Sequence, residues 1–235
     1  SGEFLDLADL LIPTSDAKIQ DDWYVEAFKG TGSNSLVVKD LQIPSHRYLS
    51  LLGLLKHDTP GIKDNYTGWL HRAEPVPVLA IALCGGAVGL GKAAKKQFME
   101  NIENKKVIYT EHVQTEWAST HITLGKAASQ IDAGELLIYR AADDTDRLAK
   151  AGEKMSMKMR GRIRMDCSHG VRLILEGATE LYLAGGAAGI SSKNPMQQIS
   201  RDLHATNMHG LLLVEPSAEV YGRILLGLEP NTIII

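Results

Sequence analysis

Apolar residues recur at steps of three and four through the last two thirds of this chain. The clearest series runs from Val113 through Trp117 to Ala141, a length of about eight helical turns. Similar patterns cover about 78–103, 154–190 and 196–227. An apolar stripe of that length needs partners along all of it, so these four segments predict a bundle of long antiparallel helices.

The first 75 residues follow a different pattern. Short runs typical of strands, LADLLIPT, DDWYVEAF and LVVKDLQIP, are accompanied by turn-forming residues such as GTGS at 30–33. Residues 48–77 are rich in Gly, Pro and His and predict a loop with at most one short helix. A few strands cannot make a well-covered sheet, so we expect residues upstream, or another chain, to complete it.

The predicted fold class is therefore α+β and mostly α. A partial antiparallel β region with an irregular connecting loop is expected over residues 1–75, and a helical bundle over 76–235. The 235 residues, 44% of them hydrophobic, are enough for one large or two small domains with a sizeable core.

Charge and hydropathy narrow the classes of partner. The net charge of −3 argues against sequence-independent binding to nucleic acid, which needs a strongly basic face. No uninterrupted apolar run reaches the roughly 18 residues of a membrane span, and the start SGEFLDLADLL lacks a basic signal region. We therefore expect a cytoplasmic protein without a membrane partner. Cys84 and Cys167 have no CxxC or Cys/His neighbours, which favours buried thiols over a disulfide or metal site.

The segment from residue 194 to the end holds the most distinctive polar pattern. Asp202, Thr206 and His209 are spaced by four and three, so on one continuous helix they would share a face. Such a face can present a polar wall to a ligand cavity, or it can simply be solvated.

Three glycine-rich segments allow two interpretations each. GGAVGLGKA at 85–93 has the spacing of a phosphate-binding loop, but Ala93 stands where a Ser or Thr should hold magnesium, and the segment also fits a helix. AGGAAG at 184–189 fits either a nucleotide contact or close helix packing before Pro195. GTGS at 30–33 would let the backbone approach a planar ligand, with Thr31 and Ser33 as donors, or it is a simple turn.

Two further groups of residues are open in the same way. The basic residues at the start of the third predicted helix form either a solvated helix start or an anion site; they are Lys154, Lys158, Arg160, Arg162 and Arg164. The loop side chains Tyr66, Trp69, His57 and His71 either wall an aromatic pocket or anchor the loop.

Four segments together resemble a known family in order and spacing. They are DDWYVEAFKGTGSNSLVVKDLQIPSHR, LCGGAVGLGKAA, LYLAGGAAGISSKNPMQQISRDLHATNMHG and YGRILLGLEP. They resemble the two-component flavin-dependent monooxygenases built on the acyl-CoA dehydrogenase fold, over about 5–47 and 78–230. The resemblance implies a middle β domain, a C-terminal four-helix bundle and a homo-oligomer, dimer or tetramer. Members also carry an N-terminal helical domain and the first half of the β domain, and often have Arg and Trp where this chain has Gln198 and Ser200.

The resemblance also implies a reaction. A separate flavin reductase would deliver reduced FAD or FMN, and oxygen would add to the flavin as a C4a-hydroperoxide. That adduct would hydroxylate an aromatic or polyketide-like small molecule, provided that the protein keeps it dry.

Residue roles carried over from the resemblance are expectations for this chain. His209 would face the reacting ring as hydrogen-bond donor or base, so that His209→Ala abolishes hydroxylation, while Asp202 orients its neighbours and Arg201 holds the helix or an anionic group. The expected cofactor contacts are Gly30, Thr31, Gly32 and Ser33 at the isoalloxazine edge, with Lys92, Gly185 and Gly186 at a phosphate or another part of the cofactor.

Two other functions remain open from the sequence. An acyl-CoA dehydrogenase would need a carboxylate base, for which Glu215 is near the right position, but Pro216 and Ser217 follow it instead of Gly and Thr. The third possibility is a non-catalytic fragment or assembly module.

Overall fold

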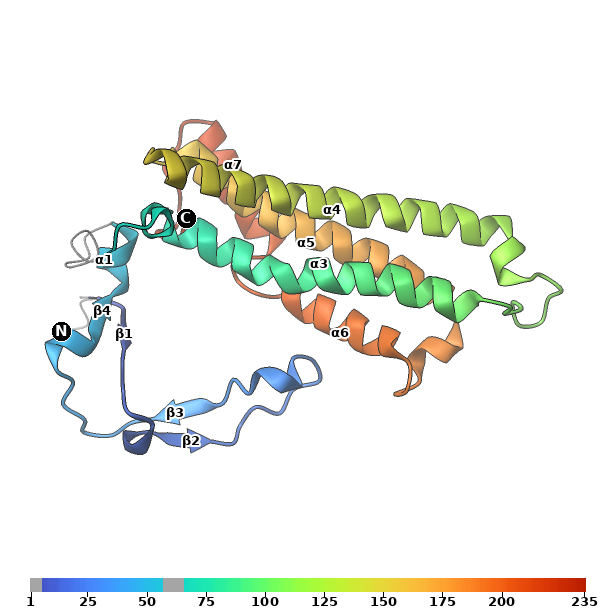
Figure 1. The fold of residues 1–235 in the computed structure, drawn as a ribbon, viewed down its shortest axis with the longest axis horizontal. Coiled ribbons are helices and arrows are strands. Elements are labelled where there is room, and N and C mark those ends of the chain that lie inside the picture. Colours follow the sequence, from blue (N-terminus) through green and yellow to red (C-terminus); the bar gives the residue numbers. More distant parts are fainter. Residues whose placement is uncertain (1–5, 57–65) are drawn as a thin grey trace.

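Three long helices run alongside one another and set the length of the molecule (Figure 1). They are α3 (Pro75–Ile102), α4 (Ala118–Ala151) and α5 (Met157–Ala184), and α6 (Pro195–Asn207) and α7 (Val214–Leu225) complete the helical part. The structure, a computed structural model, describes residues 6–56 and 66–235. The prediction of a mostly helical fold with a bundle and a small antiparallel β region is confirmed.

Local sequence explains where several of these helices begin and end. Ser156 caps α5 by accepting a hydrogen bond from the amide of Met159, and Asn194 caps α6 by accepting one from Met196. Pro195 follows at the first position of α6, where its missing N–H costs nothing. Gly152, with φ of 70°, ends α4 in the left-handed conformation that glycine tolerates best.

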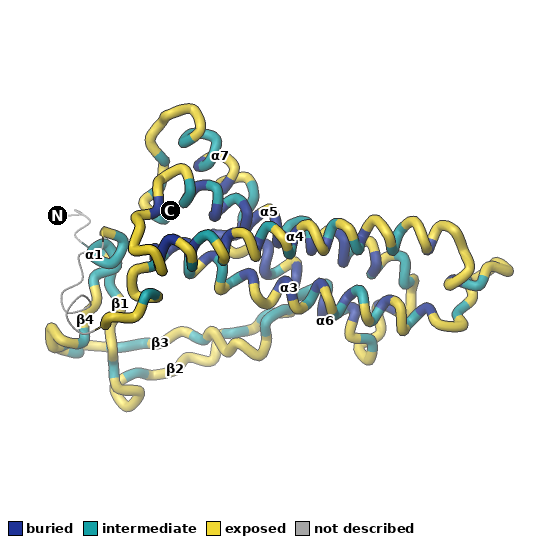
Figure 2. Tube along the Cα trace, turned by 45° about the horizontal axis from the view of Figure 1, so that its top comes forward, coloured by how far each residue is buried: buried dark blue, intermediate teal, exposed yellow. Residues whose placement is uncertain are grey.

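The hydrophobic core lies along α5, which contacts each of α3, α4, α6 and α7. Figure 2 shows the buried positions as a dark band on the inward sides of the long helices, while their outer sides are exposed. Cys84 and Cys167 both belong to this core, which confirms the expectation of buried thiols. The hydrogen bond with the neighbouring Cys84, together with burial, raises the pKa of the Cys167 thiol.

Helices α4 and α5 approach each other at glycines. A Cβ added to Gly170 would lie 2.8 Å from the carbonyl oxygen of Gly134, and one added to Gly177 would lie 2.7 Å from that of Ala127. Both distances are shorter than side chains allow against a backbone atom. The two helices can pack this closely only because these positions carry no side chain.

The N-terminal region forms two small antiparallel pairs. Strand β1 (Ala8–Leu10) pairs with β4 (Tyr48–Ser50), and β2 (Lys18–Gln20) pairs with β3 (Ser35–Val37). Helix α1 (Leu51–Leu55) follows β4. Short 3₁₀ turns connect the rest; they are η1 (Thr14–Asp16), η2 (Lys29–Thr31), η3 (Ser45–Arg47), η4 (Trp69–Arg72), η5 (Gln114–Glu116) and η6 (Ala187–Ile190).

The predicted strand DDWYVEAF is wrong, because the main-chain groups there are held by side chains instead of a partner strand. Asn34 Oδ1 accepts hydrogen bonds from the amides of Asp22 and Trp23, at 3.3 and 3.1 Å. Asp22 in turn accepts from the amide of Ser35 at 2.9 Å, and the hydrogen bonds from Ser35 lower the pKa of Asp22. Residues 21–28 are therefore an irregular loop between β2 and β3.

The predicted single helix over 196–227 is also wrong, since α6 ends at Asn207 and α7 begins at Val214. The intervening turn buries Leu211 and Leu212, which a continuous helix could not direct into the core in the same way. The second long helix begins at Ala118 instead of 113 and continues to Ala151.

Helix α3 includes the whole of the segment 85–93, so the interpretation as a phosphate-binding loop is wrong. Gly91 lies where a Cβ would meet Ile174 at 2.7 Å, which indicates helix packing.

By length and composition α3 could also span a membrane, alone among the helices in the described part of the chain. This is weak support for a span, because core helices pass the same test, and α3 packs on α4, α5 and α6.

Candidate functional site

The loop that carries the GTGS residues is organised around Phe28. Its backbone is left-handed, with φ of 55°, which is strained for a bulky residue. The carbonyl oxygen of Phe28 accepts hydrogen bonds from Trp23 Nε1 at 3.1 Å, from Thr31 Oγ1 at 3.0 Å and from the amide of Thr31 at 3.0 Å. These contacts hold the turn in one conformation.

Helix α6 fixes the same loop from the other side. The carboxylate of Asp202 accepts a hydrogen bond from the amide of Phe28 at 3.0 Å, between residues that are 174 positions apart. Arg201 donates to the carbonyl oxygen of Glu26, and its Nη2 donates to Gln197 Oε1 at 2.7 Å. Two motifs that sequence analysis treated separately therefore meet in one place, which we call the α6–turn contact, formed by residues 26–34 with Arg201 and Asp202.

The turn offers open backbone next to this contact. Gly30 and Gly32 have no atom within 4 Å of an added Cβ, and residues 29–33 are exposed. The hydroxyl groups of Thr31 and Ser33 are 2.9 Å apart. Because Thr31 also bonds to Phe28, Ser33 is left as donor to Thr31. Both hydroxyl groups therefore donate their protons within the turn. A planar ligand at this position would contact mainly backbone atoms.

His209 does not share the helical face of Asp202, because it lies beyond the end of α6 in the turn before α7. Its side chain is exposed, and its Nδ1 accepts a hydrogen bond from the amide of Leu211 at 3.2 Å. Thr206 is buried and its hydroxyl donates to the carbonyl oxygen of Asp202 at 2.8 Å. The three residues therefore do not form the expected polar stripe. Asp202 binds the loop, Thr206 binds its own helix and His209 is exposed to solvent.

The other expected cofactor residues lie outside the α6–turn contact. Lys92 pairs with Glu135 of α4 at 2.5 Å, and this hydrogen bond raises the pKa of Lys92. Gly185 and Gly186 follow the end of α5, where Lys105 Nζ donates to the carbonyl oxygen of Gly185 at 2.6 Å. Gly186, with φ of 71°, has no atom within 4 Å of an added Cβ.

The basic group at the start of α5 is mostly paired within the chain. Arg160 pairs with Glu74 at 2.5 Å, Arg162 pairs with Asp144, and Arg164 donates to the carbonyl oxygen of Ile234. Burial lowers the pKa of Arg164. Lys154 and Lys158 are exposed.

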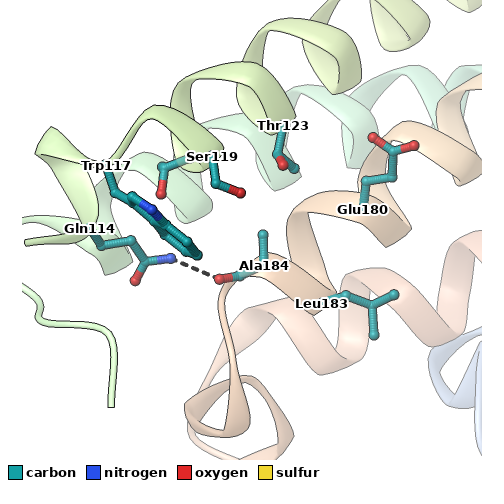
Figure 3. Close-up of a pocket in the computed structure, with 8 residues that line it drawn as sticks. Gln114, Trp117, Ser119, Thr123, Glu180, Leu183 and Ala184 are labelled. Carbon is teal, nitrogen blue, oxygen red and sulfur yellow. Dashed lines mark hydrogen bonds between the residues drawn. The ribbon is translucent and has the colours of Figure 1, made fainter. Parts of the chain in front are cut away.

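A shallow hollow of about 500 Å³ lies between the start of α4 and the end of α5 (Figure 3). Gln114 crosses it to donate to the carbonyl oxygen of Ala184 at 2.7 Å, and Trp117 stacks on His112. Glu180 is the one ionisable side chain among the described residues that line it. This hollow contains none of the predicted site residues.

Glu215, the expected base of a dehydrogenase, is exposed in the first turn of α7.

In the loop before α3, Tyr66 packs against His71 with ring centroids 4.6 Å apart, and Lys150 Nζ lies 4.5 Å from the centroid of the Trp69 ring. His57, the fourth of the expected pocket residues, is outside the described residues.

The structural roles of Phe28, Trp23 and Asn34 were not predicted from the sequence. No local pattern indicates that Phe28 is left-handed, and the partner of its amide is Asp202, far away in the chain. The one available signal was the pair Asp22 and Asn34 on either side of the loop, because both residue types often bind backbone amides in turns.

Comparison with known proteins places the helical part of this chain in a family. The family model "Acyl-CoA dehydrogenase, C-terminal domain" matches residues 81–213. The oxygenase subunit HsaA, a flavin-dependent monooxygenase of Mycobacterium tuberculosis, is 28% identical over 98% of this chain. The oxygenase component of an FADH₂-dependent resorcinol hydroxylase from a Rhizobium strain is 26% identical over 94%. This chain spans only 58% and 56% of the lengths of these two relatives.

Solved structures agree with these matches. The crystal structure of HsaA from M. tuberculosis superposes on 100% of this chain and 60% of its own with a TM-score of 0.88, at 28% identity. XiaF from a Streptomyces strain, solved with FADH₂ and glycerol, superposes on 96% of this chain and 57% of its own with a TM-score of 0.88, at 29% identity.

Proposed function

This chain belongs to the family of the acyl-CoA dehydrogenase C-terminal domain. We propose that it functions as part of the oxygenase component of a two-component flavin-dependent monooxygenase. The substrate would be an aromatic or polyketide-like small molecule; resorcinol, a phenolic compound, in the name of one relative supports an aromatic substrate. Reduced FAD or FMN would come from a separate flavin reductase. The observation that carries the proposal is the α6–turn contact, which joins the two segments most typical of these enzymes through Asp202 and Phe28.

One feature of the α6–turn contact supports the binding of a flavin ring there. The backbone at Gly30 and Gly32 is open, so a flat ring system can approach it without displacing a side chain. Asp202 and Arg201 are positioning residues in this account, because both bind the main chain of the loop and leave the turn itself to contact the ring. Bound reduced flavin would supply the electrons with which one atom of O₂ enters the substrate and the other leaves as water.

Replacing Gly30 by alanine is expected to weaken binding of reduced flavin by about 10-fold, equivalent to about 1.4 kcal/mol. The added methyl group meets no atom of the protein, so it can interfere only with a ligand that lies against the turn. Anaerobic titration with reduced FAD and with reduced FMN measures the effect, and thermal unfolding checks the fold. Gly125→Ala on the exposed side of α4, which is equally free of contacts, is the matched control. Equal affinities for the two variants would contradict the assignment.

His209 is proposed as a hydrogen-bond donor to the reacting substrate or ring. Since its Nδ1 accepts from Leu211, the neutral imidazole carries its proton on Nε2, which remains available as a donor. The expected loss of hydroxylation in His209→Ala is about 10-fold, less than complete, because water competes with an exposed imidazole. His209→Gln should recover part of the rate, as the amide can donate. Full coupled activity in His209→Ala, measured as product per reduced flavin, would remove His209 from the reaction.

A further inference from the structure

A second cavity in the described residues lies away from the α6–turn contact and has no part in the function proposed above. It has a volume of about 880 Å³, is open on one side, and is lined by the end of α1, by η4, by the start of α3 and by the turn between α4 and α5. This volume is within the range of cavities that bind small organic molecules. Four separate segments meet there, so the hollow is a product of the fold and not of one loop.

One side of this cavity is apolar. Leu54 and Leu55 come from α1, Leu70 from η4, and Val78 from the first turns of α3. Leu70 remains 57% exposed although it faces a hollow lined by other apolar side chains. A ligand with an apolar body would remove this surface from water.

An ion pair neutralises Glu74, the one buried carboxylate among the described residues of the lining. Glu74 is 5% exposed and pairs with Arg160 at 2.5 Å. Glu74 is also the residue before the first turn of α3, so this pair joins α3 to α5 next to the cavity. With Glu74 occupied in this way, it does not oppose the binding of an anion.

Besides Arg160, three cationic side chains of the described residues line the same cavity, namely Lys56, Arg72 and Lys154. Within residues 6–56 and 66–235, none of the three forms an ion pair, and Glu153 is the one other acid in the lining. Arg72 Nη2 donates to the carbonyl oxygen of Lys150 at 3.5 Å, which directs this side chain toward the α4 end of the cavity. Exposed lysines are common on any surface, but here cations from three segments converge on an apolar hollow.

We propose that this cavity binds an organic anion with an apolar body, such as a medium-chain or aryl carboxylate. The acidic group lies among Lys56, Arg72 and Lys154, and the apolar body lies against Leu54, Leu55 and Leu70. Lysine ammonium and arginine guanidinium groups both donate charge-assisted hydrogen bonds to such a group, which gives the site its preference for anions. The site is separate from the α6–turn contact, because none of residues 26–34, Arg201 or Asp202 lines it.

Calorimetric titration of the folded chain with decanoate tests the proposal. We expect one decanoate per chain, and at least 10-fold weaker binding in the double variant Arg72→Glu with Lys154→Glu. Lys158→Gln, at an exposed lysine of the same helix start that does not line the cavity, should bind decanoate as the unmodified chain does.

Two further probes separate the charge from the apolar body. Decyltrimethylammonium has the same chain length with the opposite charge and should bind at least 10-fold more weakly than decanoate. Inorganic phosphate alone should not compete at equal concentration, because it lacks the apolar body. Failure of decanoate to bind, equal binding of the cationic probe, unchanged binding in the double variant, or full competition by phosphate would each overturn the proposal.

Discussion

Replacing Asp202 by alanine should weaken the binding of reduced flavin by about 10- to 100-fold, since a hydrogen bond to a charged group contributes about 1.5–3 kcal/mol. The carboxylate of Asp202 is the α6 partner of the Phe28 amide, and Phe28 is left-handed at φ of 55°. Without the carboxylate, the amide loses its partner and Phe28 can return to a more favourable conformation. The open backbone at Gly30 would then no longer be held in place for a planar ring.

The test combines an affinity with a report on the turn itself. Trp23 Nε1 donates to the carbonyl oxygen of Phe28, so release of the loop should shift the emission of Trp23 to longer wavelength. Asp202→Asn keeps one oxygen as acceptor and should recover part of the affinity, whereas Gln198→Ala, at an exposed position of the same helix, should change neither signal. An Asp202→Ala variant that binds reduced flavin normally while its Trp23 emission shifts would show that the turn does not contribute to flavin binding.

Gly170→Ala should lower the free energy of unfolding by about 3 kcal/mol, the upper part of the usual range for overpacking a core. Its Cβ would lie 2.8 Å from the carbonyl oxygen of Gly134 and 2.9 Å from Ile138 Cγ1. A backbone oxygen cannot move aside alone, so α4 and α5 would have to separate along their contact. Urea unfolding followed by circular dichroism measures the loss.

Gly89→Ala on the outer side of α3 is the matched control for this substitution. Its added Cβ meets no atom within 4 Å, so the higher helix propensity of alanine should raise stability by up to about 1 kcal/mol. If both variants were equally stable, the close approach of α4 and α5 would not be a determinant of the fold.

The long helices could be predicted from the sequence because their apolar stripes bury against one another along their full length. Ile131 and Ile138 belong to the predicted stripe of α4, and both are almost fully buried in the core. Helix ends were less accurate, as the break after Asn207 shows. That break depends on the burial of Leu211 and Leu212 against other helices, which periodicity along one segment cannot indicate.

The residues of the candidate site could be predicted from the sequence, but the contact between its two segments could not. The GTGS turn and the Arg201–Asp202 pair were both selected from sequence, yet nothing in either segment shows that Asp202 binds the Phe28 amide. The strand expected at DDWYVEAF failed for the same reason, since Asn34 and Asp22 bind backbone amides that a strand partner would otherwise take. The pairing of Lys92 with Glu135 likewise depends on two helices coming together.

Hydrogen–deuterium exchange of the chain with and without reduced flavin, under anaerobic conditions, is the most direct test of the α6–turn contact as the flavin site. We expect slower exchange on addition of reduced FAD or FMN at the amides of residues 26–34 and of α6 around Arg201 and Asp202. A folded chain that shows no protection with either flavin would rule out this flavin site and favour a non-catalytic assembly module. Protection confined to other segments, such as 184–189, would rule out this site as well.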